Sequence, residues 1–243
     1  MCFNVRICKR HLLEIMSDKV EVRGGFYFKD KKVYLRVTKP LEIIDKIQLR
    51  YWYGKQVYLA MVADPSLSEE EALHAPYKKM KDAQERGTAV HKLVEDYAPT
   101  KEYLEAIDPK YKGYLRGYKD FLYENNATII KDTKTFFCDC HHLAGTLDEY
   151  IEYADGSKAI IDIKTGKDIY IEAYLQASAN RHLCLVNAMK TDKVGILQLT
   201  ETGGKRYESK NEEEVVKLFE KYLTAKSLYE FKYQEMLTDV GYL

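Results

Sequence analysis

The chain of 243 residues lacks several features that mark particular protein classes. No apolar run approaches the roughly 20 residues that a membrane-spanning helix needs, so we expect no association with membranes. The start, MCFNVRICKRHLLEIM, interrupts its apolar stretch with charges and makes a poor signal peptide. We therefore expect a soluble protein of the cytoplasm.

Cysteine is scarce, and no two cysteines form a C-x-x-C pair; the set is Cys2, Cys8, Cys138, Cys140 and Cys184. An odd, scattered set argues against the disulfide framework of a secreted protein. The cluster Cys138-Asp-Cys140-His141-His142 suggests zinc, but structural zinc sites usually space their ligands by two to four residues and need a second pair elsewhere. We interpret this cluster as a strand and its exit turn.

An excess of charge of either sign is also absent, because 38 basic residues balance 38 acidic ones. This balance is weak evidence against non-specific binding of a polyanion over the whole surface, and it leaves a local basic groove open. No GxxxxGK[ST] loop is present, so a built-in ATPase motor is not expected.

Hydrophobic periodicity predicts a mixed α/β fold with one central mixed β-sheet flanked by helices. A hairpin at 26–37 and a helix from Thr38 to about Tyr53 form an N-terminal extension, 1–75, packed on a core of 76–243. Ser68 and Glu71 carry the capping-box pattern of a helix start. Further helices are expected at 77–97, 110–125, 169–189 and 211–231, and strands at 128–137, 146–153, 158–164, 193–200 and 205–208.

The segment from Gly145 to Gly166 contains the residues that indicate a function. Asp162 and Lys164 are two apart in a strand and therefore project from one face. A three-residue loop at 154–156, closed by Gly156 in the left-handed region, would set Asp148 opposite Asp162. Two- or four-residue loops would instead turn Asp148 to the other face.

Two facing carboxylates repel each other unless a cation lies between them, and hard oxygen ligands suit Mg²⁺ or Mn²⁺. Such a cation polarises a phosphate oxygen and the attacking water, and a neighbouring lysine orients the water or offsets charge in the transition state. For Asp162-x-Lys164 alone, a solvated hairpin face with an ion pair is the commoner explanation. The ordered combination with Gly145-Thr-x-Asp148 and Gly166 favours metal-dependent phosphodiester hydrolysis.

These motifs resemble those of the PD-(D/E)XK nuclease superfamily, and in particular its RecB-like exonuclease branch, which includes phage recombination and mitochondrial genome-maintenance exonucleases. Gly145–Asp148 is similar to the branch's G-x-x-D element, and Asp162-Ile-Lys164 to its D-x-K element. Gly87-Thr-Ala-Val-His91 resembles the G-x-x-x-H helix, and Gln176 begins a segment like the Q-x-x-x-Y helix. The resemblance covers about residues 36–210 and implies a restriction-endonuclease-like core.

The resemblance implies a role for each matching residue. Asp148, Asp162, the backbone carbonyl of Ile163 and His91 would be ligands of one or two Mg²⁺ or Mn²⁺ ions, with His91 near the metals or the scissile phosphate. Lys164 would be the catalytic lysine, and Gln176 would support the site or contact DNA. The sequence departs from the pattern at Asn180, where the family usually has Tyr, and at Thr133, where the branch often has Glu. An Fe–S cluster is not expected, because no C-terminal cysteine group could hold it.

Asn180, Arg181 and Lys167 are candidate DNA contacts, although solvated side chains are the commoner explanation for such residues. The motifs and the resemblance together predict an exonuclease that acts on DNA ends or single strands in recombination, repair or genome maintenance, with a phage as one candidate source of the gene. A single-strand annealing or binding protein is a candidate partner. The alternatives are a structure- or site-specific endonuclease and, in a different class, a catalytically silent module that binds nucleic acid.

Overall fold

The computed structural model describes residues 20–97, 100–130 and 135–243, so Cys2, Cys8 and Thr133 lie outside the described part of the chain. Its strands are β1 (Glu21–Arg23), β2 (Phe26–Lys29), β3 (Lys32–Arg36), β4 (Thr128–Ile129), β5 (Thr135–Cys138), β6 (Leu143–Thr146), β7 (Glu149–Glu152), β8 (Lys158–Lys164), β9 (Lys193–Leu199) and β10 (Lys205–Lys210). Its helices are η1 (Lys39–Ile43), α2 (Ile47–Ala63), α3 (Glu69–Glu95), α4 (Lys101–Ala106), η2 (Pro109–Tyr111), α5 (Lys112–Glu124), α6 (Ile171–Val186), α7 (Glu212–Lys232) and α8 (Gln234–Asp239).

The strands form two mixed five-stranded sheets, in the orders β1-β2-β3-β6-β5 and β10-β9-β8-β7-β4. In each sheet one pair is parallel, β3 with β6 and β8 with β9, and the other pairs are antiparallel. The mixed α/β class is therefore confirmed, and the expected central sheet is divided into two sheets.

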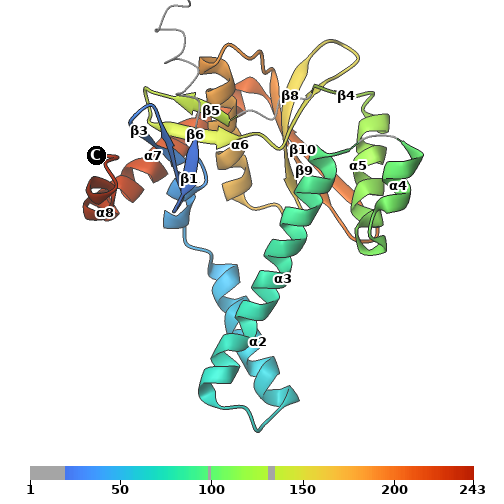
Figure 1. Cartoon of the computed structure of the whole chain (residues 1–243), viewed down its shortest axis with the longest axis vertical. Helices are drawn as coiled ribbons and strands as arrows, with labels where there is room; N and C mark the ends of the chain where they lie inside the picture. The colour runs from blue at the N-terminus through green and yellow to red at the C-terminus, as the bar shows by residue number, and fades with distance from the viewer. Residues whose placement is uncertain (1–19, 98–99, 131–134) are drawn as a thin grey trace, which may run out of the picture.

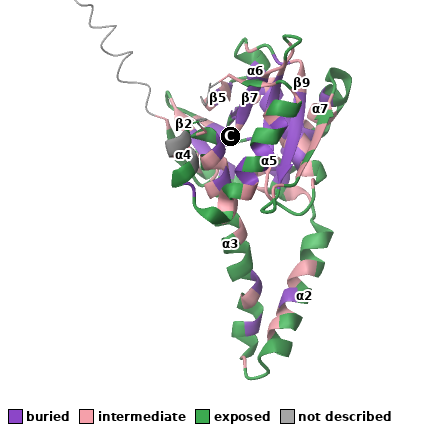
Figure 2. Cartoon of the chain, turned by 90° about the vertical axis from the view of Figure 1, so that its right-hand side faces the viewer, coloured by how far each residue is buried: buried purple, intermediate pink, exposed green. Residues whose placement is uncertain are grey.

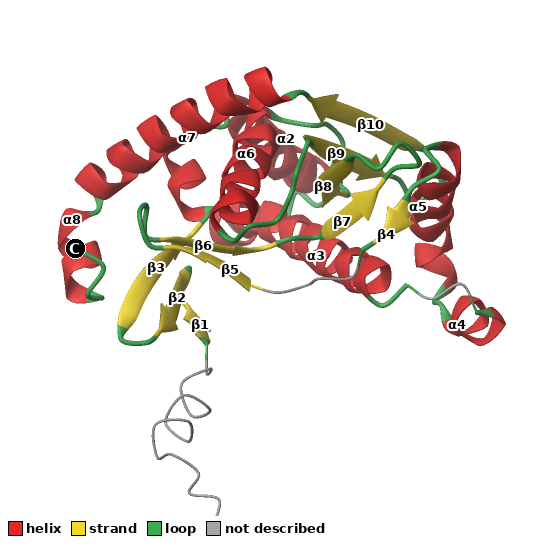
Figure 3. Cartoon of the chain, turned by 90° about the horizontal axis from the view of Figure 1, so that it is seen from above, coloured by secondary structure: helices red, strands yellow, loops and turns green. Residues whose placement is uncertain are grey.

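Helices cover both faces of the second sheet (Figure 3). On one face, α6 and α7 share a hydrophobic core with the first sheet and with Ile160, Val194 and Ile196. On the other face, α3 and α5 pack against a core that includes Ile161 and Ile163. Alternation along β8 thus sends its odd-numbered and even-numbered residues into two different layers.

The N-terminal hairpin agrees with its sequence prediction, because Asp30 and Lys31 form its turn with positive φ of 51° and 62°. The helix predicted from Thr38 to Tyr53 is wrong in its extent. A 3-10 helix ends at Ile43, and α2 begins at Ile47 and continues to Ala63. The residues at 44–46 therefore form a break between two helices, which periodicity alone did not indicate. The Thr38 side chain makes no capping hydrogen bond.

Helices α2 and α3 form an antiparallel arm that extends away from the two sheets (Figures 1 and 2). Ser68 and Glu71 make both hydrogen bonds of the predicted capping box at the start of α3. Because α3 runs without a break from Glu69 to Glu95, the expected boundary between 75 and 76 falls inside one helix. Within the described residues, neither of these helices nor any other combines the length and apolarity needed to cross a bilayer.

The region after α5 also differs from the prediction. The single strand expected at 128–137 is described as two short strands, β4 and β5, which belong to different sheets. The strand expected at 146–153 is likewise divided between β6 and β7, with a bend at Asp148. Because this bend joins the two sheets, it brings the G-x-x-D segment to their junction.

Candidate active site

The β7–β8 hairpin has the register predicted for it. Tyr153 donates its amide hydrogen to the carbonyl of Ser157 at 2.9 Å, and Gly156 adopts a φ of +78° in the three-residue loop. Glu149 pairs with Ile161, so the same register continued by one residue sets Asp148 opposite Asp162. The left-handed glycine is therefore the local device that turns Asp148 toward Asp162.

Asp162 is the buried member of the cluster, with 4% of its surface exposed. It shares its strand face with Ile160 and Lys164, and this face looks toward α6. The Lys164 ammonium lies 2.7 Å from Oδ2 of Asp162. Oδ1 of Asp162 has no hydrogen-bond donor among the described residues. The free-energy cost of burying this oxygen is therefore not offset by any hydrogen bond from this part of the chain.

Asp148 stands at the bend where β7 begins. Its Oδ2 accepts a hydrogen bond from the amide of Ile163 at 2.8 Å. If β7 began earlier, that amide would pair with the backbone of β7, so the Asp148 carboxylate replaces a ladder hydrogen bond just before the strand begins. The side chain is thereby tied to the strand that carries Asp162 and Lys164.

Gln176 joins the cluster from the first half of α6. The Lys164 ammonium donates to Oε1 of Gln176 at 3.2 Å and is about one third exposed. Lys164 therefore lies between an acidic partner on its own strand and an amide partner on the covering helix.

Helix α3 contributes His91, whose Nδ1 lies 3.2 Å from Oδ1 of Asp148. Gly87, one turn earlier, faces the loop after Lys164: a Cβ built there would meet only Thr165 Oγ1, at 3.6 Å. This is an ordinary van der Waals distance, so packing within the described protein does not require glycine at position 87. The G-x-x-x-H segment is thus placed at the rim of the cluster.

The electrostatics reflect how closely these groups lie. Burial raises the pKa of Asp162 to about 6; the charge of Asp148 acts in the same direction, and Lys164 opposes it. Burial lowers the pKa of Lys164, but the carboxylate of Asp162 outweighs this effect and holds that pKa above its ordinary value. In the same way, Asp148 outweighs the burial of His91 and raises the pKa of the imidazole.

The structure contradicts two of the three expected DNA contacts. Arg181 is 6% exposed, and its guanidinium donates to the carbonyl of Thr191 and the carboxylate of Glu212. Asn180 is 4% exposed. Because both side chains are buried, they are not available to a phosphate, whereas Lys167 is exposed and stays a candidate contact.

Gly145 has a packing role that the motif alone did not show. A Cβ at this position would lie 3.1 Å from Asn180 Oδ1, from Leu183 and from Val37. Such contacts are tighter than ordinary ones, so glycine lets α6 approach β6 closely. The same contact explains why Asn180 is buried beneath the sheet junction.

Sequence reasoning missed a second buried acid, Glu149, which is 6% exposed. Strand alternation places it with Ile161 on the face opposite Asp162, where it raises the pKa of Tyr118 together with the burial of that phenol. A charged residue at the inward position of a short strand was the signal that could have identified it.

Comparisons with known proteins add little. No family model matches the chain, and no curated protein matches it. Among solved structures it is similar to an alkaline exonuclease (LHK-Exo) from Laribacter hongkongensis, with 7% identity over 86% of this chain and 93% of that one and a TM-score of 0.41. The complex of LHK-Exo with dAMP gives the same identity and coverage and a TM-score of 0.40. SSO0001 is 16% identical over 89% of this chain and 82% of that one, with a TM-score of 0.34.

Proposed function

We propose that the protein is a metal-dependent deoxyribonuclease that hydrolyses phosphodiester bonds with Asp148, Asp162 and Lys164 at its centre. The observation that carries this proposal is the buried Asp162 carboxylate, which faces Lys164 and Asp148 and has an oxygen without a donor in the described part of the chain. The resemblance of the surrounding motifs to those of PD-(D/E)XK nucleases supports the same conclusion.

The residues present fit a hard divalent cation. Asp162 and Asp148 offer carboxylate oxygens, and Mg²⁺ and Mn²⁺ prefer such ligands. The Ile163 carbonyl is a further ligand that we propose from the family pattern. When bound, such a cation supplies Lewis-acid polarisation of the phosphate and of the attacking water.

We assign Lys164 the role of a charged donor. Its pKa is held above the ordinary value by Asp162, so the ammonium stays protonated at neutral pH. An ammonium in this position orients the attacking water or offsets negative charge on the phosphate in the transition state. Gln176 keeps the ammonium on the α6 side of Asp162.

His91 is assigned a place at the rim. Among the described residues, the ligand atoms of His91, Asp148 and Asp162 do not all come within 4.8 Å of one another. His91 instead contacts Asp148, so we propose that it positions this carboxylate and faces the substrate phosphate, and we prefer this role to that of a metal ligand.

We extend the proposal to an exonuclease that acts on DNA ends or single strands in recombination, repair or genome maintenance, with a single-strand annealing or binding protein as a candidate partner. The family motifs favour this form over a structure- or site-specific endonuclease. The presence of all three central residues argues against a catalytically silent binding module.

The test is incubation of linear and closed-circular DNA with Mg²⁺ or Mn²⁺, with Asp162→Asn and Lys164→Met as the central variants. Asp120→Asn and Lys119→Met, at exposed positions on α5, are the matched controls. We expect wild type and controls to shorten linear DNA progressively, and the two central variants to lose at least about a hundredfold in rate. Cutting of circles would establish the endonuclease instead. Cleavage that needs no metal, or that survives both central substitutions, would refute the assignment.

A further inference from the structure

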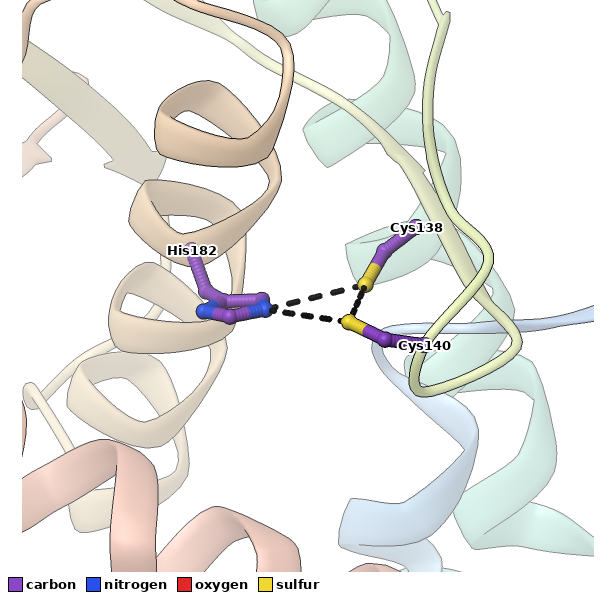
Figure 4. A group of neighbouring side chains, drawn as sticks. All are labelled: Cys138, Cys140 and His182. Atoms are coloured by element: carbon purple, nitrogen blue, oxygen red, sulfur yellow. Dashed lines mark hydrogen bonds between the residues drawn. The ribbon is translucent and has the colours of Figure 1, made fainter.

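Two thiols and an imidazole meet on the first sheet, away from the carboxylate cluster. Cys138 ends β5, and Cys140 follows in the turn to β6. Their sulfurs are 3.1 Å apart and lie 3.6 Å and 4.0 Å from Nε2 of His182 on α6. Figure 4 shows both sulfurs pointing toward the edge of the imidazole ring. The sequence cluster did form a strand and its exit turn, as expected, but α6 supplies the distant third member.

The surroundings hold this arrangement in place. The ring of His182 stacks on Phe219 of α7, with centroids 4.3 Å apart and an angle of 14° between the planes. Cys138 is 1% exposed, whereas Cys140 is exposed and His182 is half-buried. A surface hollow lined by Lys32, Asp139 and both cysteines opens at the turn. The cluster is therefore open to solvent on the side of Cys140 and closed on the side of Cys138.

These distances suit a cation better than they suit a bond between the sulfurs. A disulfide needs its sulfurs about 2 Å apart. In a tetrahedral zinc site, bonds of about 2.3 Å to sulfur and 2.0 Å to nitrogen place neighbouring ligand atoms roughly 3.5–3.8 Å apart. The two sulfur–nitrogen distances are close to this range, and the two sulfurs would separate slightly around a cation.

We propose that Cys138, Cys140 and His182 bind a borderline-soft divalent cation, with Zn²⁺ as the best chemical match and the fourth position open to solvent beside Cys140. Two thiolates and a neutral imidazole balance the charge of one such ion, and soft sulfur ligands disfavour Mg²⁺. Among all the described residues, this is the one group of three His, Cys, Asp or Glu side chains whose ligand atoms lie within 4.8 Å of one another.

The buried Cys138 alone would be an ordinary core cysteine, since free cysteines are often buried. Packing in the core does not explain why the exposed Cys140 and the Nε2 atom of His182 also meet at this point. The ion would clip the β5–β6 turn to α6 about 9 Å along the helix axis from Gln176, since the six intervening steps each rise 1.5 Å. The site is therefore a structural support for the helix that contacts Lys164, and it takes a different metal from the carboxylate cluster.

The test uses the reduced full chain, stripped of metal and titrated with Co²⁺ and then with Zn²⁺ in competition with a chromophoric chelator. We expect one equivalent to bind with the thiolate-to-cobalt charge-transfer absorption of a sulfur-ligated ion, and any Co²⁺ bound by the carboxylate cluster to lack this absorption. Cys138→Ser and His182→Gln should each weaken Zn²⁺ binding by at least about a hundredfold. Cys184→Ala, a buried cysteine elsewhere on α6, and Asp162→Asn should each keep the one equivalent that gives the charge-transfer absorption.

Circular dichroism of each variant separates loss of the site from loss of the fold, and Cys140→Ser, at an exposed position, serves if Cys138→Ser does not fold. Absence of the charge-transfer band in wild type, or Zn²⁺ affinity unchanged in both cysteine variants, overturns the proposal. With oxidised glutathione added as the oxidant, formation of a Cys138–Cys140 disulfide in saturating Zn²⁺, located by mass spectrometry of the peptide as a loss of two hydrogens, also overturns it.

Discussion

The carboxylate of Asp148 accepts a hydrogen bond from the amide of Ile163, the residue between Asp162 and Lys164. A side chain at the junction of the two sheets is thus tied to the strand that carries the other two central residues. The tie also explains how Asp148 keeps its direction although it lies outside β7, one residue before the strand begins. Strand β8 therefore holds all three central residues in place. The variants below each change a different side chain around this strand or elsewhere on the protein.

Gln176→Leu should lower kcat without preventing folding. Gln176 accepts a hydrogen bond from the Lys164 ammonium, and hydrogen bonds to charged groups contribute roughly 1.5–3 kcal/mol, which is about ten- to hundredfold in rate. Gln176→Glu keeps an acceptor at this position and is expected to retain more activity. Steady-state kinetics on linear DNA measure the difference. A Gln176→Leu variant with wild-type kcat would show that Gln176 does not contribute to catalysis.

Gly87→Ala should stabilise the protein and impair its activity. An alanine in the middle of α3 gains up to about 1 kcal/mol in helix propensity, and its Cβ meets only Thr165. If the substrate phosphate approaches this rim, the added methyl group should cost about ten- to hundredfold in kcat/KM. Gly54→Ala, on α2 with open space around it, is the control: it should give a similar gain in stability and leave activity unchanged. Full activity in Gly87→Ala would show that DNA does not approach here.

The contribution of Asp162 to metal-free stability should fall as pH rises from about 4 to about 6. The folded-state pKa of Asp162 is about 6 and its ordinary value is 3.8, so in this window the folded chain binds more protons than the unfolded one. Denaturant unfolding in a chelating buffer measures the slope for wild type, for Asp162→Asn and for Asp120→Asn. The slope of unfolding free energy against pH should become more positive in Asp162→Asn alone, and an identical slope in all three proteins would contradict the raised pKa.

Substitution of Lys167 should affect DNA binding, and substitution of Arg181 should affect the stability of the fold. Lys167→Ala should weaken binding to all sequences and reduce the salt dependence of log Kd by about one unit, since one phosphate contact is lost. Arg181→Met should leave this slope unchanged and lower the free energy of unfolding by about 1–3 kcal/mol, because the carbonyl of Thr191 loses its buried donor. A salt slope reduced by Arg181→Met would show that this arginine reaches DNA after all.

Local chemistry alone determined much of the candidate site. The alternation of β8 places Asp162 and Lys164 on one face, and Gly156, with its positive φ, sets the register that brings Asp148 opposite Asp162. The capping box at Ser68 likewise depends only on residues three apart. Such features were predictable because each is decided within one turn or one strand pair.

Only the tertiary structure decided what lies beyond that range. Asn180 and Arg181 look like surface residues of a helix, yet both are buried. The approach of α6 to β6 over Gly145 covers Asn180. Arg181 instead bonds to Thr191 and Glu212. The chain position of His182, 44 residues after Cys138, contains no sign that the two side chains meet. Helix packing joins segments that are far apart in sequence, so the sequence indicated the carboxylate cluster, and the fold alone assembled the thiol–imidazole cluster.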